Sequence, residues 1–180
     1  MKRIIVLFVV AFVSINGFAQ TWLGLTTSNV NFREGPSVEY DVIKKLPKNT
    51  LLYIDSDDEV NGFYLAVDIE NDEEGYVSTD YVKYHKDVEK TKGAAIQSVG
   101  TSTSYNPEIE VRNKTDVYMS LRINSTTYKF SPHETRMITI PPGRFSYRAS
   151  SPGVIPAAGY YDVDSNHYYE WEFWIRTTRR

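Results

Sequence analysis

Two acidic stretches of this sequence have carboxylate spacing that could bind a metal ion. Residues 55–59 (DSDDE) and residues 162–166 (DVDSN) each carry carboxylates at alternate positions. Such spacing is typical of calcium loops, but a helix-flanked calcium loop also needs glycine at its sixth position and glutamate at its twelfth. Those positions hold Val60 and Ala66 in the first stretch, and His167 and Phe173 in the second. We therefore interpret both stretches as solvated turns and predict no metal site.

No residues in the chain have the spacing of a catalytic centre. The sequence has no cysteine, which excludes cysteine nucleophiles, thiolate zinc sites and disulfides. His85, His133 and His167 are far apart in sequence and lack metal-ligand spacing. A glycosidase needs only two carboxylates, but no pair stands out among acids that lie in predicted turns. We expect neither enzymatic activity nor a cofactor.

Aromatic residues next to the acidic loops form a first candidate binding surface. Phe63, Tyr64 and Tyr76 lie close in sequence to residues 55–59 and to residues 70–74. An aromatic shelf with an acidic rim can bind a peptide amine or a basic partner. The alternative is that these aromatics belong to the core and that the acids only keep the protein soluble.

The last predicted strand, residues 168–175, forms a second candidate surface. Alternation places one set of side chains on the core face: Tyr169, Trp171, Phe173 and Ile175. The opposite face then holds Tyr168, Glu170, Glu172 and Trp174. Tyr168 and Trp174 beside two carboxylates can stack on sugar rings or dock a partner chain. The alternative is that a second sheet or another domain covers them.

The N-terminus has the pattern of a secretory signal peptide. Lys2 and Arg3 precede an apolar run at residues 4–13, and small residues, Gly17 and Ala19, precede the expected cut. The run is too short to span a bilayer, which needs about 20 apolar residues. We expect residues 1–19 to be removed, leaving an exported protein, periplasmic or secreted, with no integral membrane segment.

The charge of the chain makes nucleic acid an unsuitable partner. Its 20 Lys and Arg face 23 Asp and Glu, for a net charge of −3. A protein that binds nucleic acid through phosphates needs an excess of basic residues. We therefore expect no nucleic-acid partner.

The hydrophobic pattern predicts an all-β chain with two domains. Short apolar runs separated by glycine, proline and acidic turns fill residues 29–84, with no helical period. Residues 85–104 are charged, then small and polar, which indicates a linker. Six or seven short strands follow in residues 105–180, and their close spacing predicts a β-sandwich-like domain. Among these elements we expect a polar turn at residues 113–116 and a short strand at residues 159–163.

The first domain, expected over residues 20–84, resembles the bacterial SH3-like family. Four groups of residues match the family pattern in order: VNFREGPS at residues 30–37; Tyr40, Val42 and Ile43; GFYLAV at residues 62–67; and GYVS at residues 75–78 followed by Tyr81-Val82. The family more often has tryptophan where this chain has Phe63. We expect Gly35-Pro36 to form a turn and Gly75 to relieve a tight hairpin. Trp22 precedes the matched segment, and we expect it to cap the domain.

The resemblance implies a small barrel of an exported protein that binds peptidoglycan or another protein of the cell envelope. The candidate ligand-binding residues are Tyr40, Phe63, Tyr64, Tyr76 and Tyr81, with Asp57, Asp58, Glu73 and Glu74. The alternative is a carbohydrate-binding or adhesion protein that uses Tyr168 and Trp174 of the C-terminal domain.

Overall fold

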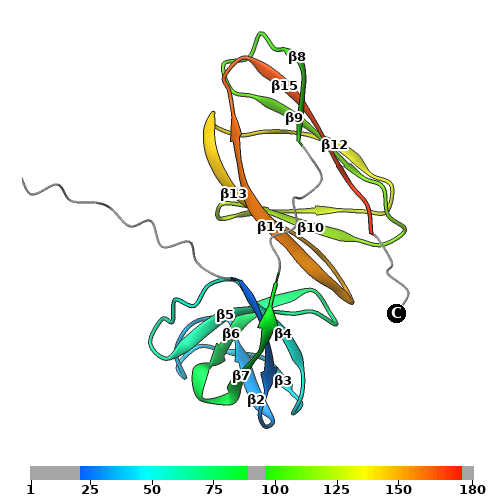
Figure 1. The fold of residues 1–180 in the computed structure, drawn as a ribbon. Coiled ribbons are helices and arrows are strands. Elements are labelled where there is room, and N and C mark those ends of the chain that lie inside the picture. Colours follow the sequence, from blue (N-terminus) through cyan, green and yellow to red (C-terminus); the bar gives the residue numbers. More distant parts are fainter. Residues whose placement is uncertain (1–20, 89–95, 176–180) are drawn as a thin grey trace, which may run out of the picture.

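The computed structural model describes residues 21–88 and 96–175. Within these ranges the chain forms strands and one short 3-10 helix, arranged as two β-domains (Figure 1). The prediction of an all-β fold is therefore confirmed. The predicted signal peptide, residues 1–19, lies outside the described residues. No helix in the described ranges has the length and apolar character needed to cross a bilayer.

The first domain is one seven-stranded sheet with the strand order β3-β2-β6-β5-β4-β1-β7. Its elements are β1 (Trp22–Thr26), β2 (Val30–Arg33), β3 (Val42–Leu46), β4 (Leu51–Ile54), β5 (Phe63–Asp68), β6 (Glu73–Ser78), the 3-10 helix η1 (Thr79–Tyr81) and β7 (Val82–Asp87). Asn61 and Gly62 form a tight turn before β5, because both residues have positive φ and Val60 exchanges backbone hydrogen bonds with Phe63.

Side chains from the inner face of this sheet form the core of the first domain. The core residues are Trp22, Val30, Phe32, Leu46, Leu52, Ile54, Ala66 and Val77. Gly75 is required here because strand β2 crosses close to it. A Cβ at Gly75 would lie 2.8 Å from the backbone oxygen of Arg33. Gly75 was expected to relieve a tight hairpin. In the structure it is needed because β2 and β6 approach each other too closely for a side chain at this position.

The second domain contains two four-stranded sheets that enclose a common core. One sheet has the order β11-β10-β13-β14 and the other has the order β12-β9-β15-β8. The strands are β8 (Gln97–Thr101), β9 (Glu108–Asn113), β10 (Met119–Ile123), β11 (Thr126–Phe130), β12 (Thr135–Thr139), β13 (Gly143–Ser151), β14 (Val154–Val163) and β15 (His167–Phe173). The core residues come from both sheets, which is the arrangement of a sandwich.

The structure also differs from the sequence prediction at Trp22, at the linker and in strand β14. Trp22, expected to cap the first domain, begins strand β1 and is 6% exposed in its core. The linker predicted at residues 85–104 is shorter, because β7 extends to Asp87 and β8 occupies Gln97–Thr101. Both are edge strands with mostly exposed side chains, so they pair through the backbone and carry no hydrophobic alternation.

Strand β14 is also longer than predicted. The sequence indicated a short strand at Gly159–Val163, whereas β14 runs from Val154 to Val163. Its first half was missed because Pro156 interrupts the strand pattern there. Proline is accommodated because β14 is the last strand of its sheet, and its pairing with β13 is irregular between Ala149 and Ser151.

Candidate functional site

The two domains pack against each other through the outer face of the first domain's sheet. Strands β1, β4 and β5 bury residues on both faces, which a single barrel core does not require. The outward-facing set is Leu23, Tyr53, Val67 and Ile69, against which Ala158 of β14 packs. Gly153, at the β13–β14 turn, donates a backbone hydrogen bond of 2.7 Å to the oxygen of Ile69. The sheet therefore has one face on its own core and one on the second domain.

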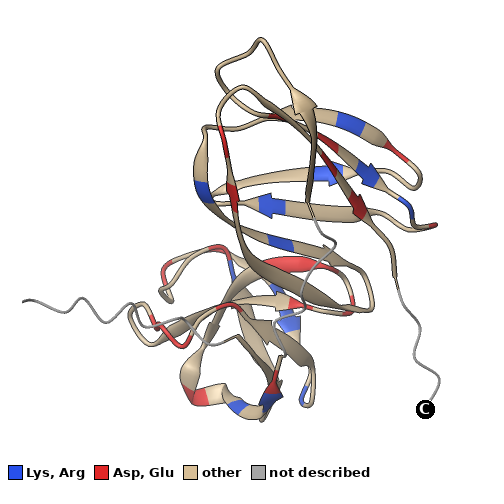
Figure 2. Ribbon diagram, turned by 45° about the horizontal axis from the view of Figure 1, so that its top comes forward, with Lys and Arg blue, Asp and Glu red and all other residues tan. Residues whose placement is uncertain are grey.

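Ion pairs cross the same junction. The guanidinium of Arg148, only 8% exposed in its side chain, pairs with Glu74 and lies 3.4 Å from Asp55. Arg122 pairs with the same Glu74 oxygen at 2.6 Å, and it is the cross-strand neighbour of Arg148. Figure 2 shows acidic segments of the first domain next to basic segments of the second where they meet. Glu74 thus offsets the repulsion between two adjacent arginines.

The two arginines lower the pKa of Glu74. Burial raises the pKa of Glu74, but the charges and hydrogen bonds of Arg148 and Arg122 together outweigh it. The pKa therefore lies below the ordinary value of 4.5. A carboxylate whose pKa is lower in the folded state adds stability above its unfolded pKa and loses it as the pH falls.

We expect the docked form to lose stability as the pH falls below about 4.5, because Glu74 then binds a proton more readily in the unfolded chain. The Glu74→Gln variant should be less stable at neutral pH and show a shallower loss towards acid pH. Urea unfolding from about pH 7 to about pH 3 measures this difference. A variant curve parallel to that of the wild type would assign the acid sensitivity to other carboxylates.

A hollow of about 360 Å³, which we call the junction groove, lies between the domains beside this ion-pair cluster. Its lining from the first domain is Thr21, Asp55, Ser56, Asp58, Val60, Leu65 and Tyr76, and from the second domain Ser146, Tyr147, Ala158, Gly159 and Tyr160. Tyr76 faces the groove because it pairs with Leu65 across β5 and β6 on the outer face. Both domains therefore contribute aromatic rings to one site.

The second domain's share of the groove depends on close packing of β13 and β14. Tyr147 pairs with Gly159, where an added Cβ would lie 3.0 Å from the Tyr147 ring. The Tyr147 ring also stacks on Tyr161 at 5.4 Å between centroids. Burial, with the adjacent Tyr161, raises the pKa of Tyr147 to about 12, so its hydroxyl stays protonated at neutral pH.

A second hollow of about 610 Å³ is lined in part by Glu74 and Arg148 of the ion-pair cluster. It is polar, and its lining includes Lys44, Asp72, Glu74, Lys129 and Arg148. Several of these groups are already paired, since Lys44 contacts Asp68 and Glu73, and Ser120 donates to Asp72 at 2.7 Å. Positive and negative groups are mixed here, which favours no single ligand charge.

The predicted aromatic shelf is divided between two faces of the sheet. Tyr64 pairs with Val77 on the inner side and packs edge-on against Trp22 at 5.5 Å, whereas Tyr76 lies in the junction groove. Phe63 is 9% exposed and belongs to the core. Tyr64 and Tyr76 therefore do not share one surface, because successive residues of a strand point to opposite sides.

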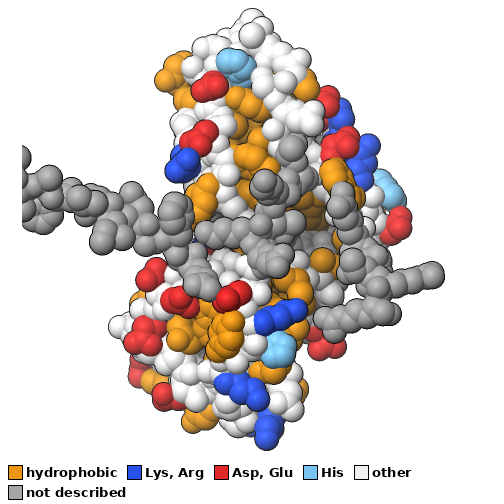
Figure 3. All heavy atoms as spheres, viewed as in Figure 1, with side chains coloured by type: hydrophobic (Ala, Val, Ile, Leu, Met, Phe, Trp, Pro, Cys, Tyr) orange, Lys and Arg blue, Asp and Glu red, His pale blue; other side chains and the backbone are white. Residues whose placement is uncertain are grey.

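The remaining predicted residues of the first domain lie in several places. Asp58 lines the junction groove, Asp57 is exposed in the same loop, and Glu73 pairs with Lys44 at 2.7 Å. Tyr40 covers Gly35, and its backbone oxygen accepts a 2.7 Å hydrogen bond from Arg33. Tyr81 is exposed in η1. Figure 3 shows hydrophobic side chains on one face of this domain, with acidic side chains on one side of them and basic side chains and a histidine on the other.

The alternative surface on the last strand carries a charged network. As predicted, Tyr169, Trp171 and Phe173 are buried. Ile175, predicted for the same face, is instead 41% exposed, because β15 ends at Phe173. On the opposite face the guanidinium of Arg112 pairs with three carboxylates, those of Glu110, Glu170 and Glu172. The Tyr168 hydroxyl donates to Glu110 at 3.1 Å, and Trp174 is 51% exposed just beyond β15.

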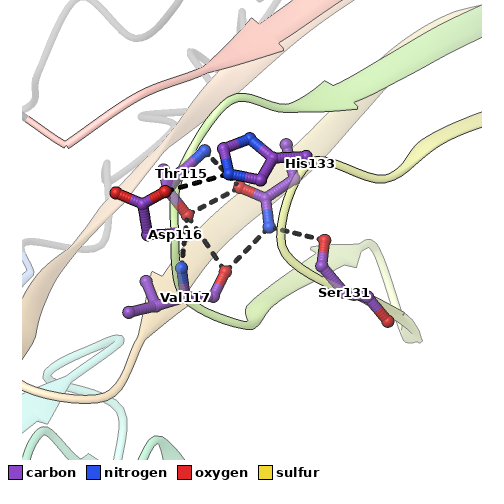
Figure 4. A network of polar contacts seen from close by, with 6 residues as sticks. Thr115, Asp116, Val117, Ser131 and His133 are labelled. Atoms are coloured by element: carbon purple, nitrogen blue, oxygen red, sulfur yellow. Dashed lines mark hydrogen bonds and ion pairs between the residues drawn. The ribbon is translucent and has the colours of Figure 1, made fainter.

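The three histidines lie in different parts of the fold. His85 is in β7, His133 is between β11 and β12, and His167 is the first residue of β15. His133 contacts Asp116 at 2.9 Å, at the rim of a network shown in Figure 4. There the buried Asn113 amide donates at 2.9 Å to the backbone oxygens of Val117 and Ser131. This network fixes the predicted turn after β9. In the described ranges, no three His, Asp or Glu side chains are placed to hold a metal ion.

Comparison with known families identifies the first domain. Residues 28–83 match the family model of the bacterial SH3 domain. The N-terminal domain is therefore a bacterial SH3 domain, as its sequence pattern indicated, and this family suggests binding of peptidoglycan or protein. No curated protein matches the chain. No solved structure matches it either.

Proposed function

We propose that this chain is an exported, non-catalytic binding protein of the bacterial cell envelope, and that its junction groove binds peptidoglycan peptide. The observation that carries this proposal is the groove itself, about 360 Å³ and lined by tyrosines and carboxylates from both domains. Ligand pockets typically measure about 300–1,000 Å³ and combine aromatic walls with a few polar groups. The proposal of export rests on residues 1–19, and the non-catalytic role on the absence of cysteine and the separation of the histidines.

The test is cosedimentation of the purified full-length protein with isolated sacculi. The wild type should pellet with the sacculi. Tyr160→Ala should reduce retention about tenfold, because truncating an aromatic anchor in a binding pocket costs on the order of 1–2 kcal/mol. Tyr160 is 53% exposed, so this change should leave the fold intact. Tyr118→Ala is the matched control, since Tyr118 is 67% exposed and lies outside the groove.

A second candidate function is carbohydrate binding or adhesion through the C-terminal domain, which the exposed ring of Trp174 favours. Sugar rings stack on exposed aromatic faces. The same experiment separates the two functions. Loss of retention in Trp174→Ala, with Tyr160→Ala unchanged, would reject the groove and support the carbohydrate surface. Wild-type protein that stays in the supernatant would reject peptidoglycan binding.

A further inference from the structure

We infer that the junction groove is a composite site for a primary ammonium group, in which Asp58 supplies the charge and Tyr76 and Tyr160 supply the aromatic walls. The inference deepens the proposed function, on which it rests for the source of the ligand. It requires both domains, because Asp58 and Tyr76 belong to the SH3 domain and Tyr160 to the second domain.

The junction groove carries a negative charge. Its described lining includes two carboxylates, Asp55 and Asp58, and no lysine, arginine or histidine. Asp55 lies 3.4 Å from Arg148, so its charge is partly offset by the ion pair that joins the domains. Asp58 forms no ion pair within the described part of the chain. The groove is therefore negative, and Asp58 provides most of its uncompensated charge.

The position of Asp58 is fixed by its own loop. The Ser56 hydroxyl donates to one Asp58 carboxylate oxygen at 2.8 Å, and the Asp58 backbone N–H donates to the Ser56 hydroxyl oxygen at 2.9 Å. These neutral contacts hold the side chain without cancelling its charge. A carboxylate held in this way can accept further hydrogen bonds from a cationic donor.

The aromatic walls favour the same ligand. Tyrosine faces attract cations through the ring quadrupole, so Tyr76 and Tyr160 favour an ammonium group over an anion. The volume of the groove suits an amino-acid side chain with its flanking peptide. Peptidoglycan stem peptides carry a diamino acid whose side-chain amine is free wherever no cross-link forms. That amine is the chemical group that we expect the groove to bind.

The test of the ligand class uses a probe that does not depend on peptidoglycan. The full-length protein is titrated with Nα-acetyl-lysine amide and followed by two-dimensional amide NMR. We expect shifts at groove residues, such as Val60 and Gly159, and none with the Nε-acetylated probe. Asp58→Asn should weaken binding about tenfold, since a charge-assisted hydrogen bond is lost. Asp57→Asn is the matched control, because it removes the same charge from the same loop outside the groove.

Equal weakening by both variants would show a general charge effect and overturn the inference. So would equal shifts with the Nε-acetylated probe, or the absence of groove shifts with the free amine. A parallel cosedimentation with sacculi whose amines have been acetylated keeps the two proposals apart. Retention on acetylated sacculi, equal to that on native sacculi, would reject the ammonium site while leaving peptidoglycan binding in place.

Discussion

Replacing Arg148 by alanine is expected to lower the free energy of unfolding by about 3 kcal/mol, because it breaks a buried ion pair and leaves charges without their partner. Arg148 is 7% exposed and contacts both Glu74 and Asp55 across the domain junction. Urea unfolding followed by tryptophan fluorescence measures the change, since Trp22 reports on the first domain and Trp171 on the second. We expect the two domains of the variant to unfold in separate transitions.

Arg144→Ala is the matched control for this prediction. Arg144 lies in the same strand, β13, and also forms an ion pair, at 3.0 Å from Asp162, but both side chains are about two-thirds exposed. An exposed pair of this kind contributes about 0–1 kcal/mol. Similar losses in both variants would mean that Arg148 acts as an ordinary surface charge. A further check is Glu74→Gln, which should cost less in the Arg148→Ala background than in the wild type.

The second large effect is expected at Trp171, where alanine should cost about 4 kcal/mol and unfold the second domain at moderate temperature. Trp171 is completely buried between the two sheets. Its ring lies 5.0 Å from that of Tyr147 and 4.8 Å from that of Phe173, centroid to centroid. Alanine would leave a cavity in the sandwich that these rigid rings cannot fill. Thermal unfolding followed by near-ultraviolet circular dichroism measures the loss.

Trp174→Ala provides the comparison, three residues further along the chain. Its ring is 51% exposed, so truncation should change the free energy of unfolding by less than about 0.5 kcal/mol. If Trp174→Ala destabilised the chain as much as Trp171→Ala, the strand would have to present its opposite face to the core. Trp171→Ala should also disturb the junction groove, because Tyr147 lines the groove and its ring packs on that of Trp171.

Alternation along single strands explains why most of the second domain could be predicted. Met119, Leu121 and Ile123 alternate with polar residues in the sequence, and all three are buried. The edge strand β8 and the end of β7 escaped prediction because their side chains lack this alternation. Strand β8 pairs with β15 through backbone groups, and all five of its residues are exposed. No hydrophobic period is needed to make such a strand.

The candidate site was only partly predictable. Asp58 and Tyr76 were among the predicted residues, but Tyr160 and Arg148 were not, because neither stands in a motif. The guanidinium of Arg148 hydrogen-bonds to Glu74 and Asp55, which lie 74 and 93 positions earlier in the sequence. The only local indication was the position of Arg148 between Tyr147 and Ala149 in a hydrophobic strand. A buried arginine there requires an acidic partner.

The sequence by itself determined the all-β class, the bacterial SH3 domain and the core face of most strands, because side-chain periodicity and turn residues act over a few neighbouring positions. The tertiary structure decided which surfaces meet. It placed Tyr64 and Tyr76 on opposite faces, docked the outer face of the SH3 sheet on the second domain and formed the junction groove from both. These outcomes depend on contacts between residues far apart in the chain, and only the packing of the two domains brings them together.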